Sequence, residues 1–148
     1  MPLVYQVYVG EPSKLYDWCV ASVREYCKAH GHHHIVQHDP ILKIAPDTSN
    51  PRCNRSRESF GKHGGFLPIF EKECAFAHFK DYDEVAIIDA DVWVRPGAPD
   101  IFAELRGADF GGVPERDIPS TPKHRRKMRG YSRLFQPLSD VCWDIDPE

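Results

Sequence analysis

The chain is organised around the stretch Val85-Ala86-Ile87-Ile88-Asp89-Ala90-Asp91, in which four consecutive apolar residues lead directly into two aspartates. An apolar run without polar alternation is typical of a parallel strand that is buried on both faces. We therefore expect a central strand at residues 85–88, with both carboxylates at its carboxyl end. Open α/β sheets bind their ligands at that end of their strands.

The segment before residue 40 predicts a strand, a helix and a second strand. Positions 4–9 are rich in β-branched and aromatic residues, and this run stops at Gly10. Pro12 and Ser13 are typical helix-start residues, and Gly31 is a typical helix end. Between them, apolar or small residues recur at three-to-four spacing (Leu15, Cys19, Ser22, Val23, Tyr26 and Cys27). With a second strand at 33–37, this βαβ unit implies a parallel sheet with helices packed on it.

The remaining segments are expected to alternate between loops and short elements. Prolines and glycines punctuate residues 40–68, which predict a long loop. Helix periodicity resumes at 69–79, a short helix is expected between Pro99 and Gly107, and a further strand at 109–114. The tail from residue 115 has no assigned structure. A length of 148 residues predicts a single domain over 1–148.

Composition restricts the partners and the compartment. Lys and Arg total 19 against 22 Asp and Glu, so the charge balance argues against a nucleic-acid partner. No segment reaches the ~20 apolar residues of a membrane span. The N-terminal residues lack the basic and apolar regions of a signal peptide. Five cysteines without a C-x-x-C pair favour reduced thiols and a cytoplasmic protein.

The two aspartates at the strand end predict a cation site. Neighbouring carboxylates repel each other and raise each other's pKa unless a cation is supplied. Mg²⁺ and Mn²⁺ prefer oxygen ligands and are commonly held by one or two carboxylates together with substrate phosphates. A small residue, Ala90, separates Asp89 from Asp91 and would let a diphosphate approach closely. Such a cation would neutralise the charge that develops on a departing nucleoside diphosphate.

Three stretches resemble the GT-A class of glycosyltransferases. Residues 85–94 resemble the strand-DxD-strand signature of that class. Residues 22–31 resemble the first helix of its retaining galactosyl- and xylosyltransferases, which often ends in Tyr-Cys-x-x-His-Gly. Residues 70–74 look like the start of the helix before the DxD strand, where such families often carry a lysine. Only the DxD block is specific, and the resemblance extends over roughly residues 4–114.

The resemblance implies a Rossmann-like GT-A nucleotide-diphospho-sugar transferase fold, a mostly parallel central sheet flanked by helices. The implied reaction moves a sugar from a nucleoside-diphosphate sugar donor to a glycan or other hydroxyl acceptor, with Mn²⁺ or Mg²⁺ as cofactor and retention of configuration. Asp89 and Asp91 are the implied metal ligands. The implied donor-binding residues are Tyr8, Val9, Gly10, Lys72, Asp89 and Ala90. Residues 111–115 are a weaker candidate for the border of the sugar pocket. No residue is assigned the catalytic role.

One departure from the GT-A pattern and one competing motif keep other functions open. Only residues 92–148 follow the Asp pair, which is short for a GT-A domain and implies a partial domain. The chain is alternatively a non-catalytic nucleotide-sugar-binding module. An apolar strand followed by Asp-x-Asp also occurs in haloacid-dehalogenase-like phosphatases, where the first Asp is the nucleophile. Those enzymes prefer Thr or Val at the position of Trp93 and carry the motif on the first strand.

Two further patterns are interpreted as solvated surface rather than as sites. Five histidines cluster at positions 30, 32, 33, 34 and 38, but alternate residues of a strand point to opposite faces, so at most part of the cluster converges. A basic run occupies residues 123–129 and is more typical of a solvated helix face or loop than of an anion site.

Overall fold

The computed structural model describes residues 1–44, 65–109, 111 and 112. In chain order the elements are β1 (Leu3–Val7), α1 (Lys14–His30), β2 (His33–Gln37), the 3-10 helix η1 (Pro68–Lys80), β3 (Val85–Ile87) and α3 (Ile101–Glu104). The chain divides into two compact units, Met1–Arg106 and Gly107–Glu148, and all six elements belong to the first. The expectation of one domain over 1–148 includes residues outside those described and stays a prediction. The basic run and most of the long loop lie outside the described residues.

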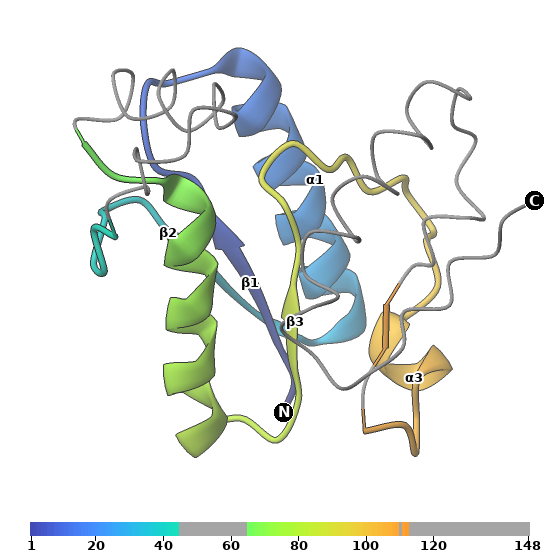
Figure 1. The fold of residues 1–148 in the computed structure, drawn as a ribbon. Coiled ribbons are helices and arrows are strands. Elements are labelled where there is room, and N and C mark those ends of the chain that lie inside the picture. The colour runs from blue at the N-terminus through green and yellow to red at the C-terminus, as the bar shows by residue number, and fades with distance from the viewer. Residues whose placement is uncertain (45–64, 110, 113–148) are drawn as a thin grey trace, which may run out of the picture. The chain divides into compact units, whose positions relative to one another are not determined.

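The three described strands form one parallel sheet in the order β2-β1-β3 (Figure 1). Leu3 of β1 stands opposite His33 of β2 on one side and opposite Val85 of β3 on the other. The predicted α/β class with a parallel sheet is therefore confirmed, and this small sheet with its helices is compatible with a Rossmann-like fold. In the part of the chain that is described, no helix is long and apolar enough to span a membrane.

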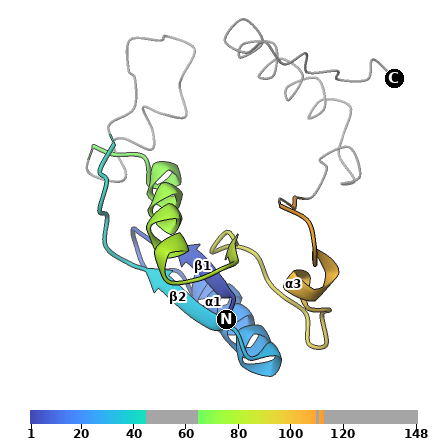
Figure 2. The same cartoon turned by 90° about the horizontal axis from the view of Figure 1, so that it is seen from below.

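Helices α1 and η1 cover opposite faces of the sheet (Figures 1 and 2). The alternation of side chains along β1 accounts for this arrangement. Val4 packs with Val23, Tyr26 and Cys27 of α1. Its neighbours Leu3 and Tyr5 point to the other face and pack with Ala75 of η1. A strand that packs against apolar layers on both faces must itself be buried, and residues 3–6 are at most 2% exposed.

Helix α1 follows the predicted start and end. Ser13 occupies the N-cap position in an extended conformation, and Gly31 ends the helix in the left-handed region at φ 74°. There its N–H donates to the Cys27 carbonyl, a common helix ending that glycine adopts without steric cost. The predicted stripe is buried at Cys19, Val23, Tyr26 and Cys27 and partly buried at Ser22, but Leu15 is 56% exposed.

The expectation that residues 85–88 form the central strand is wrong for the described sheet. The central strand is β1, and β3 lies at an edge with half-buried residues, Ile87 being 44% exposed. Ala86 and Ile88 pack against the α1 layer, and Val85 packs against the η1 layer. Both faces of this segment are therefore only partly buried. The uninterrupted apolar run therefore reflects contact with two layers and not a central position.

The other expected elements are found with altered limits. The first strand stops at Val7 rather than at Val9. The helix expected at 69–79 exists but is a 3-10 helix of 13 residues, which is long for that type. The short helix after Pro99 is present as α3, where the Asp100 side chain caps the N-terminus by accepting from the Phe102 N–H at 3.0 Å. Residues 92–94 are not in a strand, and 110, 113 and 114 of the expected last strand are outside the described residues.

Candidate functional site

The two aspartates lie on a tight turn that leaves the carboxyl end of β3. The Ile88 N–H donates to the Tyr5 carbonyl at 3.0 Å, which holds the chain against β1 for one residue beyond the strand. The Val92 N–H then donates to the Asp89 carbonyl at 3.1 Å, so that Ala90 and Asp91 are the corner residues of a β-turn. Both aspartates are exposed, and we call residues 89–92 the Asp turn.

Ala90 anchors the Asp turn to the body of the protein. Its side chain is buried and belongs to a cluster with Tyr8, at the end of β1, and Val20 of α1. The small size of Ala90 therefore serves packing between the strand end and the helix. This packing fixes Ala90, and the two exposed aspartates lie on either side of it.

Two polar side chains that were not predicted as site residues hold the Asp turn and the segment directly after it. Gln6, which is fully buried in β1, donates from Nε2 to the Asp89 carbonyl at 3.2 Å and accepts from His34 Nε2 at 2.9 Å. Ser22 of α1 accepts from the Val94 N–H at 2.9 Å and donates to the Cys19 carbonyl at 2.7 Å. The signal for Gln6 was a polar residue inside an otherwise apolar strand, because a buried amide of that kind needs partners.

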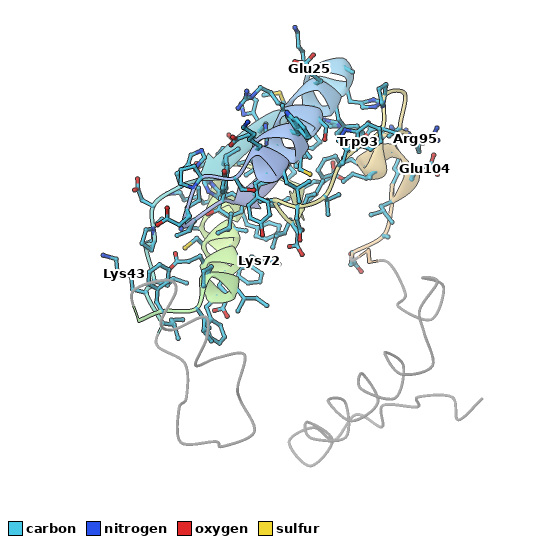
Figure 3. All side chains as sticks on the ribbon, turned by 90° about the horizontal axis from the view of Figure 1, so that it is seen from above. Glu25, Lys43, Lys72, Trp93, Arg95 and Glu104 are labelled. Carbon is cyan, nitrogen blue, oxygen red and sulfur yellow. The ribbon has the colours of Figure 1, made fainter. Side chains whose placement is uncertain are left out.

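Lys72 of η1 reaches the first carboxylate. Its Nζ forms an ion pair with Asp89 Oδ1, and the side chains of Lys72 and Asp89 are 33% and 53% exposed. Figure 3 labels Lys72 on η1. A partly solvated pair of this kind is worth about 0.2–1 kcal/mol. The predicted donor residue Lys72 and the predicted metal ligand Asp89 are therefore brought together, whereas Asp91 lies exposed on the next corner of the turn.

The residue before Lys72 fixes the orientation of η1. Glu71 is fully buried, and Oε2 accepts from the N–H groups of Ile41 and Leu42 at 2.7 and 3.1 Å, while Oε1 accepts from that of Lys43 at 2.7 Å. Gln37 also donates to Oε2 at 2.8 Å. Burial by itself raises the pKa of Glu71, but these hydrogen bonds outweigh it and hold the pKa below its usual value. With Glu71 fixed inward, Lys72 is directed to another side of the helix.

A buried polar chain continues from Glu71 into the sheet. Gln37 donates to Glu71 and accepts a hydrogen bond from the Tyr5 hydroxyl. Burial, together with the nearby Cys74 thiol and Glu71 carboxylate, raises the pKa of Tyr5 to about 12. Tyr5 therefore stays a neutral donor, and this chain of hydrogen bonds ties η1 to β1 and β2.

The segment after β1 exposes less side-chain surface for donor binding than the predicted roles of Tyr8, Val9 and Gly10 imply. The Tyr8 ring is buried, its hydroxyl accepts from the Ser13 N–H at 2.7 Å, and it can donate to Asp17 Oδ1 at 3.0 Å. Tyr8 therefore joins the strand end to the start of α1. Val9 is half-buried and Gly10 is exposed with φ 122°, so these two residues form the accessible part of the strand end.

The five clustered histidines do not converge on one point. His30 contacts the Ala98 carbonyl at 3.0 Å, and His32 pairs with Asp100 at 2.8 Å. The other three contact Tyr82, Gln6 and the Tyr8 carbonyl, respectively, which places them against different elements. Burial lowers the pKa of His34, and Arg24 lowers it further. The interpretation of this cluster as solvated surface is wrong for His32, whose side chain is 5% exposed and pairs with Asp100, and holds for the exposed His33 and His38.

The Asp turn fits a minimal set of ligands for a hard cation. Within residues 1–44, 65–109, 111 and 112, no group of three or more His, Cys, Asp or Glu side chains is gathered for a metal. Two exposed carboxylates on one turn nevertheless match the way Mg²⁺ is usually held, by one or two carboxylates with phosphates and water completing the shell. A cation bound here would need further oxygen ligands from another molecule.

Comparison of the chain with models of protein families, with curated proteins and with solved structures finds no match in any of the three.

Proposed function

We propose that the Asp turn binds the diphosphate of a nucleotide sugar through Mn²⁺ or Mg²⁺, and that the chain is a glycosyltransferase of GT-A type. The observation that carries the proposal is the pair of exposed carboxylates, on one turn at the carboxyl end of a parallel strand, fixed from beneath by the buried Gln6. Ligands of open α/β sheets bind at that end. The donor would be a nucleoside-diphosphate sugar and the acceptor a glycan or other hydroxyl compound.

The chain's own residues would bind and orient the donor. Asp89 and Asp91 would supply carboxylate oxygens. Gln6 limits the movement of the Asp turn that carries them, and Ser22 limits that of Val94, two residues beyond the turn. Such preorganisation lowers the cost of binding, because the ligands need not be ordered afterwards. When bound, the cation would supply charge neutralisation at the diphosphate leaving group.

We also propose that the protein is cytoplasmic. The three cysteines in the described part of the chain, at positions 19, 27 and 74, are free thiols. Burial raises the pKa of Cys27 to about 11, so that this thiol is held protonated and unreactive. Inert buried thiols are typical of proteins in reducing compartments.

Calorimetric titration with UDP, GDP, ADP and CDP, each with and without Mn²⁺, tests the proposal. We expect at least one nucleoside diphosphate to bind about tenfold or more tightly with Mn²⁺ than without it, which corresponds to about 1.4 kcal/mol. Assays of sugar release and transfer from the matching donor should then show turnover.

The same assays separate the competing functions. Mn²⁺-dependent binding without turnover of any donor would identify a binding module. Release of phosphate from small phosphomonoesters, with no affinity for nucleoside diphosphates, would instead indicate the phosphatase chemistry. The absence of Mn²⁺-dependent binding to all four nucleotides would refute the proposal.

A further inference from the structure

The first carboxylate of the Asp turn already has a positively charged partner. Lys72 Nζ contacts Asp89 Oδ1, an atom that a cation held between the two aspartates would be expected to use. Within the described residues, the Asp91 side chain makes neither an ion pair nor a hydrogen bond. The two ligands therefore differ, because one is neutralised by an ammonium group and the other is open to solvent.

The ammonium is held in place from the far side of η1. The buried Glu71 binds the backbone of residues 41–43 and fixes the rotation of this helix, which directs the neighbouring Lys72 toward the Asp turn. At the same time both partners of the ion pair are partly exposed, so that the pair is weak enough to exchange. A fixed but exchangeable ammonium is a suitable competitor for a cation.

We infer that Lys72 is the resident counter-charge of Asp89, and that a divalent cation must displace it in order to bind. This inference rests on the proposed function and concerns the selectivity of the same site. An ammonium group cannot share the lone pair it contacts with a metal, and it repels a second positive charge nearby. A cation without nucleotide therefore binds the Asp turn more weakly, because it must compete with the lysine. A cation bound to a diphosphate would bring oxygen acceptors for the displaced ammonium.

The consequence is a site that discriminates against cations without nucleotide. With Lys72 in place, the turn offers one free carboxylate instead of two. Removal of the lysine should therefore strengthen the binding of a bare cation, an effect opposite in sign to that of structural damage. This sign makes the inference testable separately from the stability of the protein.

The test is the affinity of the full chain for Mn²⁺ alone, measured at low ionic strength from the paramagnetic resonance signal of free Mn²⁺. We expect Lys72→Met and Lys72→Gln to bind Mn²⁺ about fivefold more tightly than the parent, the factor that the loss of one exposed ion pair allows. Lys72→Arg, which keeps the charge, should retain the parental affinity. The gain should shrink at high salt, because the charges are then screened.

Lys80→Met is the matched control, because it removes an exposed lysine from the same helix. Its affinity should stay within twofold of the parent. An unchanged or weaker affinity in the folded Lys72→Met variant overturns the inference, as does an equal gain in Lys80→Met. If neither the parent nor Lys72→Met binds Mn²⁺ alone, the inference fails, whereas the proposed function fails only if Mn²⁺-dependent binding of the nucleoside diphosphates is absent as well.

Discussion

Replacement of Asp91 by alanine should abolish the Mn²⁺-dependent binding of nucleoside diphosphates, with a loss of affinity of about a hundredfold or more. In the proposed site Asp91 would supply one of the two carboxylate ligands found among the described residues, and even residues that merely orient a ligand cost about 10–100-fold when they are removed. The substitution deletes an exposed charge and no buried volume. We therefore expect the free energy of unfolding to change by less than about 0.5 kcal/mol, so that the loss can be assigned to the site.

The control for this experiment is Asp83→Ala. Asp83 also belongs to an Asp-x-Asp sequence, and its side chain is 98% exposed in the polar turn before β3. Its removal should leave nucleotide affinity unchanged in calorimetric titrations with Mn²⁺. Parental affinity in Asp91→Ala, or an equal loss in Asp83→Ala, would show that the Asp turn does not form the proposed site.

Replacement of Glu71 by alanine should destabilise the protein by about 4 kcal/mol, a large part of the total stability of a small domain. The carboxylate accepts hydrogen bonds from three consecutive backbone N–H groups and from Gln37. Its removal leaves these donors without an acceptor in a buried position, and each unsatisfied group costs about 1–3 kcal/mol unless water enters. Urea denaturation followed by circular dichroism would measure the change.

Glu73→Ala provides the comparison on the same helix. Glu73 is exposed, and its replacement should change the free energy of unfolding by less than about 0.5 kcal/mol. A loss below 1 kcal/mol in Glu71→Ala would mean that the hydrogen bonds around Glu71 do not hold η1 to the loop after β2. The position assigned to Lys72 would then lack its structural basis.

Local periodicity predicted most of the elements. The β-branched run at the N-terminus, the helix between Ser13 and Gly31 and the strand at 33–37 all depend on neighbours within a few positions, and all three are found. The turn carrying the two aspartates was also placed at the end of the expected strand, because the apolar run stops abruptly at Asp89. These features are encoded by residues close together in the sequence.

The supports of the site depend instead on contacts between distant residues. Gln6 and Asp89 are 83 positions apart, and Ser22 and Val94 are 72 apart, so that neither contact leaves a local pattern. Glu71 looked like an ordinary charged residue of an amphipathic helix, since its backbone donors lie about 30 positions earlier. The edge position of β3 escaped prediction for a related reason, because an apolar run reports contact with two layers but not the order of strands.

The most direct measurement of the central claim is electron–nuclear double resonance on Mn²⁺ bound to the chain together with the nucleoside diphosphate that it prefers. With ¹³C-labelled aspartate carboxylates, one and the same Mn²⁺ should show hyperfine coupling to ¹³C of the protein and to ³¹P of the nucleotide. The ¹³C coupling should vanish in the variant that carries both Asp89→Ala and Asp91→Ala. Coupling to ³¹P without coupling to ¹³C in the parent protein would contradict the account, because the ion would then lie on the nucleotide away from the Asp turn.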